Sequence, residues 1–132
     1  MPAIPKRIVN PPTVAAPVGY SHAVIKSGTP VFVSGQVALD VHGAIVGEGD
    51  AAAQADQAFR NLQAVVGACG GTLSDVVKIT VYVTDPAYRS AVVEARKRFF
   101  GPGPYPASTY VVVAGLAVPQ LLVEVEAVAM ID

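Results

Sequence analysis

The sequence predicts one small α/β domain of the α+β type, in which a mixed β-sheet carries two helices on one face. Several segments alternate apolar and polar residues as strands do, two longer segments carry apolar residues at helical spacing, and glycine- or proline-rich turns separate them. The resulting order β-β-(β)-α-β-α-β-β suits such a sheet. A chain of 132 residues supports one hydrophobic core, so a single domain over residues 1–132 is expected.

Composition excludes several classes of protein. Hydrophobic residues make up 52% of the chain and charged residues only 14%, which predicts apolar surface buried between subunits. The net charge of −1 and the absence of a long basic run argue against nucleic acid and anionic membrane as partners. No apolar window is long enough to span a membrane, the proline-rich start does not resemble a signal peptide, and the lone Cys69 has no partner for an internal disulfide. We therefore expect a cytoplasmic protein.

The first third of the chain is expected to be strand and turn. Prolines at positions 2, 5, 11, 12 and 17 predict an extended arm over residues 1–19. Two β-rich runs follow, at residues 21–26 and 31–39, and the turn composition of residues 27–30 predicts that they form a hairpin. A further short run lies at residues 44–46.

A helix is predicted over residues 51–68, with Asp50 as its N-cap and Gly70 and Gly71 at its end. Its apolar residues recur at helical spacing: Ala58, Phe59, Leu62, Val65, Val66 and Cys69. Because Cys69 lies on this stripe, it is interpreted as a small core residue rather than a nucleophile.

Residues 76–84 alternate cleanly and predict a half-buried strand. Asp85 and Pro86 then begin a second helix, which the segment 101–104 (Gly-Pro-Gly-Pro) ends. The apolar stripe of this helix is Tyr88, Val92, Ala95 and Phe99. The basic cluster at residues 96–98 (Arg-Lys-Arg) is interpreted as its solvated face.

Two more strands are predicted, at residues 108–114 and 121–131. The last strand is apolar on both faces, and Glu124 and Glu126 interrupt the face turned away from the helices. The preceding strand adds to this uncovered face either Tyr110, Val112 and Ala114 or, in the other register, Val111 and Val113. An apolar face that contains carboxylates predicts a homo-oligomer with clefts between its chains.

Several segments, in this order, resemble the RidA/YjgF family of enamine/imine deaminases, also called endoribonuclease L-PSP. They are residues 34–36 (SGQ), 57–62 (QAFRNL), 76–85 (VVKITVYVTD), 98–101 (RFFG), 105–107 (YPA) and 123–127 (VEVEA). The resemblance runs from about Tyr20 to the C-terminus. It implies a chorismate-mutase-like homotrimer with three clefts at the subunit interfaces and a small-molecule substrate.

The resemblance also assigns candidate site residues. In deaminating members an arginine that grips the substrate's carboxylate stands at the position of Ser108, and a hydroxyl offers one neutral donor where the guanidinium offers two charged ones. Glu124 matches the family's acid that works on water and is the candidate catalytic residue. The candidate substrate-binding residues are Tyr20, Ser34, Ser108, Thr109 and Tyr110. Tyr110 occupies the position of the family's cleft cysteine, and Val93 that of its cleft asparagine.

Imine hydrolysis needs a proton for the nitrogen and an activated water, and one carboxyl group with a pKa near neutrality can serve both. Without the arginine, a partly buried Glu124 should have a raised pKa and favour a neutral or weakly charged substrate. In the competing interpretation, Glu124 and Glu126 are ordinary carboxylates paired with basic residues of a neighbour. Whether another arginine, such as Arg7, Arg60 or Arg89, reaches the cleft is left open.

The sequence therefore predicts a divergent imine/enamine hydrolase, or alternatively a non-catalytic trimeric protein that binds or senses a small ligand. The acidic isoelectric point, near 6.1, argues against the RNA cleavage that the family's other label suggests. The two histidines have no cysteine or carboxylate at ligand spacing, so neither a metal nor a cofactor is expected.

Overall fold

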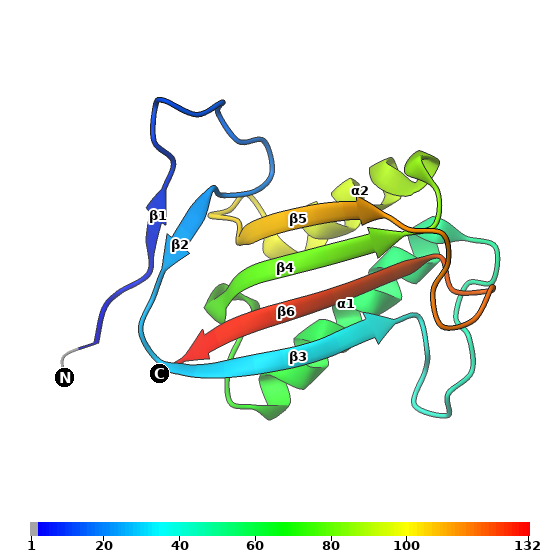
Figure 1. Cartoon of the computed structure of the whole chain (residues 1–132). Coiled ribbons are helices and arrows are strands. Elements are labelled where there is room, and N and C mark those ends of the chain that lie inside the picture. The colour runs from blue at the N-terminus through cyan, green and yellow to red at the C-terminus, as the bar shows by residue number, and fades with distance from the viewer. Residues whose placement is uncertain (1–2) are drawn as a thin grey trace.

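The computed structural model describes residues 3–132, which form a four-stranded sheet and a separate two-stranded ribbon. The sheet has the order β3-β6-β4-β5, and α1 and α2 lie together on one of its faces (Figure 1). We call this the inner face and the opposite one the open face. The elements in chain order are β1 (Arg7–Val9), β2 (Ala23–Ile25), β3 (Thr29–Val37), α1 (Ala51–Ala68), the 3-10 turn η1 (Leu73–Asp75), β4 (Val76–Val83), the 3-10 turn η2 (Pro86–Tyr88), α2 (Arg89–Phe100), β5 (Ala107–Val112) and β6 (Val123–Ile131).

The mixed sheet with two helices on one face confirms the predicted fold class. β6 lies between β3 and β4 and runs antiparallel to both, whereas β5 runs parallel to β4 and reaches it through α2. Every second residue of β6 is buried against the helices, as the alternation predicted, and these residues are Val123, Val125, Ala127 and Ala129. They pack with Phe59, Leu62 and Val66 of α1 to form the core.

The predicted hairpin between residues 21–26 and 31–39 is wrong. β2 pairs instead with β1, with Ile8 opposite Val24, and β3 pairs with β6, with Thr29 opposite Ile131. Residues 27–30 therefore do not fold β2 back onto β3, and β2 forms a ribbon with a strand from the predicted arm. The run at residues 44–46 makes one isolated bridge, from Ile45 to Leu39, rather than a strand.

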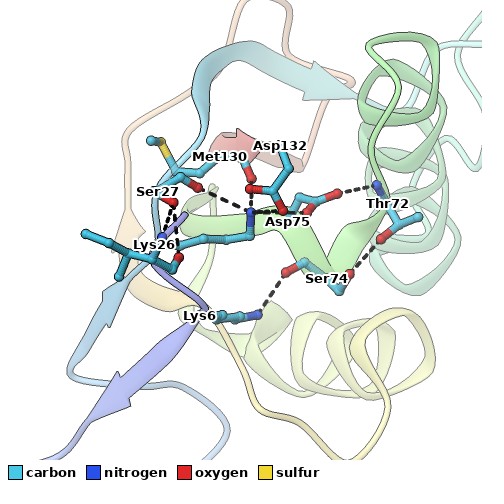
Figure 2. A network of polar contacts seen from close by, with 9 residues as sticks. Lys6, Lys26, Ser27, Thr72, Ser74, Asp75, Met130 and Asp132 are labelled. Atoms are coloured by element: carbon cyan, nitrogen blue, oxygen red, sulfur yellow. Dashed lines mark hydrogen bonds and ion pairs between the residues drawn. The ribbon is translucent and has the colours of Figure 1, made fainter. Parts of the chain in front are cut away.

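A buried lysine fixes the base of this ribbon to the sheet (Figure 2). Lys26 Nζ donates a hydrogen bond to the Met130 carbonyl oxygen at 2.7 Å and forms ion pairs with Asp75 at 3.6 Å and Asp132 at 3.4 Å. Only 9% of the Lys26 side chain is exposed, so its contacts are shielded from water. These contacts hold the chain against the sheet where β2 ends. Lys6 adds a second anchor, because its Nζ donates to the Ser74 carbonyl oxygen at 3.0 Å (Figure 2).

Both helices begin near the predicted caps. The Asp50 side chain accepts a hydrogen bond from the Ala53 amide at 3.1 Å, which satisfies one free donor at the start of α1. Asp85 caps η2 in the same way, so α2 itself starts one turn later than predicted. The interpretation of Cys69 as a core residue is wrong: this residue is the C-cap of α1, where the helix has passed the sheet, and it is exposed.

Candidate functional site

Glu124 lies on the open face of the sheet. In the pairing of β4 with β6, Tyr82 is opposite Glu124 and Thr80 is opposite Glu126, and directly opposed residues project from the same face. The Tyr82 hydroxyl donates a short hydrogen bond to Glu126 Oε1, which confirms this common face. The two carboxyl groups are therefore neighbours on the side of the sheet that no helix of residues 3–132 covers.

The surroundings of Glu124 favour its protonated form. Partial burial and the nearby charge of Glu126 raise the pKa of Glu124, in the predicted direction. Its carboxyl group lies directly against the backbone of Gly35, where a Cβ atom would be 2.6 Å from Glu124 Cδ. The Glu124 carboxyl group forms neither a hydrogen bond nor an ion pair that involves another described residue. The bulge of β3 that contains Ser34 and Gly35 thus borders an acid with free oxygens.

Ser108 and its neighbours on β5 are divided between the two faces of the sheet. Ser108 and Tyr110 are opposite Ile79 and Val81, which belong to the core, so both project from the inner face. Thr109 projects from the open face, where its Oγ1 accepts a hydrogen bond from Lys78 Nζ at 2.6 Å. Of the two registers considered for this strand, the one with Val111 on the open face is confirmed.

Ser108 and Tyr110 line a cavity of about 220 Å³ between β5 and α2. Tyr20 lies on the same cavity, so three of the candidate substrate-binding residues are together. The remaining lining residues are Val18, Arg89, Val92, Val93 and Arg96. Val93 keeps one wall apolar.

Within one chain the candidate residues thus form two groups. Tyr20, Ser108 and Tyr110 line the cavity on the inner side of β5, whereas Glu124 lies beside the Ser34 bulge on the open face. β4 separates β5 from β6, so the two backbones are two strand spacings apart, roughly 10 Å. Because Glu124 and the cavity also lie on opposite faces of the sheet, they are farther apart than the two backbones. The carboxyl group of Glu124 therefore does not reach the cavity of its own chain.

Two arginines line the cavity, and the interpretation of residues 96–98 as a solvated face is wrong for one of them. Arg96 is half-buried on the cavity, whereas Lys97 and Arg98 are exposed. The signal was present in the sequence, because positions 89, 92, 93 and 96 have the i, i+3, i+4, i+7 spacing of one helical face. Of the arginines left open, Arg89 reaches the cavity, Arg60 forms an ion pair with Asp56 on α1, and Arg7 is exposed on β1.

The cavity contains polar atoms without partners. Tyr110 Oη and Arg96 Nε are both buried and have no hydrogen bond. Burial raises the pKa of Tyr110, and the nearby Arg89, whose Cζ is 6.0 Å from the centre of the Tyr110 ring, opposes this shift. A buried donor left without an acceptor costs free energy, so both groups have hydrogen-bonding capacity that the described chain does not use.

Two features of the chain bear on other functions. Residues 3–132 contain no cluster of three or more His, Cys, Asp or Glu side chains able to hold a metal ion. No helix of the described chain is long and apolar enough to cross a membrane.

Comparisons with known proteins agree with the resemblance seen in the sequence. The model of the endoribonuclease L-PSP family matches residues 11–131. A 2-iminobutanoate/2-iminopropanoate deaminase from the mite Dermatophagoides farinae is 34% identical over 97% of this chain and 98% of its own. A RutC family protein from Pyrococcus horikoshii is 32% identical over 94% of this chain and 97% of its own.

Solved structures share the fold. A Rid-family protein from Yersinia pestis has a TM-score of 0.89 and 37% identity, covering 96% of this chain and 98% of its own. RidA from an Antarctic Psychrobacter has a TM-score of 0.72 and 38% identity, covering 89% and 92% of the two chains. From the family match, the relatives and the shared fold, we conclude that this chain belongs to the RidA/YjgF family.

Proposed function

We propose that this protein is an imine/enamine deaminase that hydrolyses a small metabolite in clefts between the chains of a homotrimer, with Glu124 as general acid and base. One observation carries the proposal: the candidate acid and the candidate binding cavity lie on opposite faces of one sheet, and each half is incomplete alone. A second chain that brings its open face to the β5 edge would join the two halves.

The chemistry follows from the state of Glu124. A protonated carboxyl donates its proton to the imine nitrogen and thereby makes the carbon electrophilic. The resulting carboxylate takes a proton from water, whose oxygen attacks that carbon. The carbinolamine then collapses, releasing ammonia and leaving a carbonyl compound. A raised pKa suits this cycle because the proton must be present at the first step and absent at the second.

The composition of the open face supports association of chains. Phe32 on β3 is 77% exposed and is opposite Val128 of β6, and Met130 continues the apolar surface along β6. A monomer would leave this apolar area in water, and burying it between chains stabilises the oligomer. The deaminase name of the mite relative supports the choice of reaction. The exposed thiol of Cys69 fits the cytoplasmic location that we propose.

A second candidate is a non-catalytic protein that binds a small ligand in the same clefts, and Ser108 is the observation that favours it. Hydrolysis of freshly generated imines, followed by ammonia release with wild type and Glu124→Gln, separates the two candidates. Loss of hydrolysis in Glu124→Gln supports the enzyme. A wild type that binds ligand and hydrolyses no imine supports the binder.

Subunit mixing tests whether the site lies between chains. Tyr20→Ala alters the cavity half and Glu124→Gln the acid half, so each variant alone should be inactive. If every cleft takes one half from each of two neighbouring chains, refolding an equal mixture restores about a quarter of wild-type activity. A mixture as inactive as its components would refute the shared site, and light scattering that reports a monomer would refute the trimer.

A further inference from the structure

The cavity beside α2 holds a pair of arginines that the chain does not neutralise. Among the described residues, neither Arg89 nor Arg96 forms an ion pair. Other cations on the helices are paired: Arg60 and Arg98 with Asp56, and Lys97 with Glu94. The positive charge that is not paired on the helices is therefore concentrated at the cavity, on Arg89 and Arg96.

The guanidinium of Arg96 is held in place although it has no acceptor. A Cβ atom on Gly19 would be 2.1 Å from Arg96 Nη2, so the guanidinium lies directly against the Gly19 backbone. Its Cζ lies 5.7 Å from the centre of the Tyr105 ring. Burial and the like charge of Arg89 lower the pKa of Arg96, and its Nε is buried without a partner. An anion placed here would relieve both the repulsion and the missing hydrogen bond.

An acid whose charge reaches this cavity, Asp85, is already engaged. Its charge raises the pKa of Tyr110, but its carboxylate accepts a hydrogen bond from the Ala87 amide at 2.8 Å and caps η2. Val18, Val92 and Val93 give the cavity apolar walls, and Tyr20 and Ser108 add neutral side chains with hydroxyl groups. A volume of about 220 Å³ with one cationic side therefore fits a short apolar group that ends in a planar anion.

We propose that Arg96, assisted by Arg89 at the rim and by the Tyr110 hydroxyl, binds the carboxylate of the substrate in place of the arginine lost at position 108. The reacting compound is then a short 2-imino acid rather than the neutral imine expected from Ser108 alone. A guanidinium fork matches the two oxygens of a carboxylate. This assignment of substrate class rests on the proposed function, whereas the binding of a carboxylate at the cavity does not.

Binding of a non-reacting acid tests the cavity directly. Calorimetry with 2-oxobutanoate, and with 2-butanone as its neutral counterpart, measures what the carboxylate contributes in the full-length protein. We expect wild type to bind the acid and not the ketone, Arg96→Gln to bind it at least about tenfold more weakly, and Arg89→Gln about threefold more weakly. Arg98→Gln removes the same charge from the same helix away from the cavity and should bind within twofold of wild type, as an approximate limit.

Several results would overturn the proposal. Equal binding of acid and ketone, unchanged affinity in both Arg89→Gln and Arg96→Gln, or tighter binding of inorganic phosphate than of 2-oxobutanoate would each do so. If circular dichroism finds Arg96→Gln unfolded, Arg96→Lys and Arg89→Gln decide instead. Arg96→Lys keeps the charge without the fork and should still weaken binding, and unchanged affinity in both variants refutes the site.

The same variants distinguish this proposal from the proposed function. Glu124→Gln should keep its affinity for 2-oxobutanoate, because the acid acts on the reaction and not on the carboxylate. Carboxylate binding that depends on Arg96, in a protein that hydrolyses no imine, would support the site and refute the deaminase. Full hydrolysis of 2-iminopropanoate by both arginine variants would support the deaminase and refute the site.

Discussion

Replacement of Gly35 by alanine should disable Glu124 without unfolding the protein. The added Cβ would lie 2.6 Å from Glu124 Cδ and 2.9 and 3.0 Å from its two oxygens. Because non-bonded carbon atoms prefer about 3.5–4.0 Å, the carboxyl group must retreat by roughly 1 Å. The end of a glutamate side chain moves at little cost to stability, whereas a displacement of about 1 Å at a reacting group lowers the rate by about 100-fold.

Two measurements test the Gly35→Ala substitution. Ammonia release from freshly generated 2-iminopropanoate should show kcat/KM lowered about 100-fold in Gly35→Ala, with circular dichroism melting little changed. A carbon-detected NMR titration should show the pKa of Glu124 falling toward its ordinary value, because the displaced carboxyl group becomes more hydrated.

Gly67→Ala is the matched control. Gly67 lies within α1, and a Cβ there has no heavy atom within 4 Å, so this variant should keep full activity and gain about 0.5–1 kcal/mol of stability. A Gly35→Ala protein with full activity and an unchanged titration of Glu124 would refute the reasoning. A Gly35→Ala protein that melts far below wild type would show that the contact is structural rather than positioning.

Three further predictions concern stability. Gln54→Leu should lower the free energy of unfolding by about 3 kcal/mol in urea titrations. The fully buried Gln54 amide forms hydrogen bonds with three backbone groups, and these groups would lose their partners. A loss below about 1 kcal/mol would contradict this. Lys26→Met should cost about 2 kcal/mol by the same measurement, since Asp75 loses its cation, and Lys26→Arg should recover part of it. The raised pKa of Glu124 means that the folded state holds this proton more tightly than the unfolded chain, so its ionisation destabilises the fold as pH rises through the folded pKa. The melting temperature of Glu124→Gln should therefore exceed that of wild type more at about pH 8 than at about pH 4, and a constant difference would exclude the shift.

The elements with long, regular patterns were predictable from the sequence. Residues 51–68 and 76–83 fold as predicted because their apolar spacing extends over many residues, and each has one face to bury. The true partners of β2 and β3, by contrast, were not predictable by the same reasoning, and the hairpin expected between them does not form. Thr29 finds its partner at Ile131, about a hundred positions away, and the composition of a local turn carries no information on so distant a strand.

The candidate site was only partly predictable. The alternation of a strand already requires that Ser108 and Thr109 face opposite ways, yet which of them faces the helices depends on the register with β4. Arg96 was missed because it stands beside two exposed basic residues, and a run of charge predicts a solvated surface unless helical spacing is followed. The resemblance named residues of both halves, but the separation of those halves is a property of the folded sheet.

The position of β6 has a consequence for synthesis on the ribosome. This strand is the last to be made, yet it lies in the interior of the sheet and supplies the pairing edges of both β3 and β4 (Figure 1). Until it leaves the exit tunnel, β3 lacks a partner among the other described strands of the sheet and β4 can pair with the parallel strand β5 alone. The nascent chain must therefore carry unpaired, apolar strands until residues 123–131 have been made, and such strand edges are prone to aggregate.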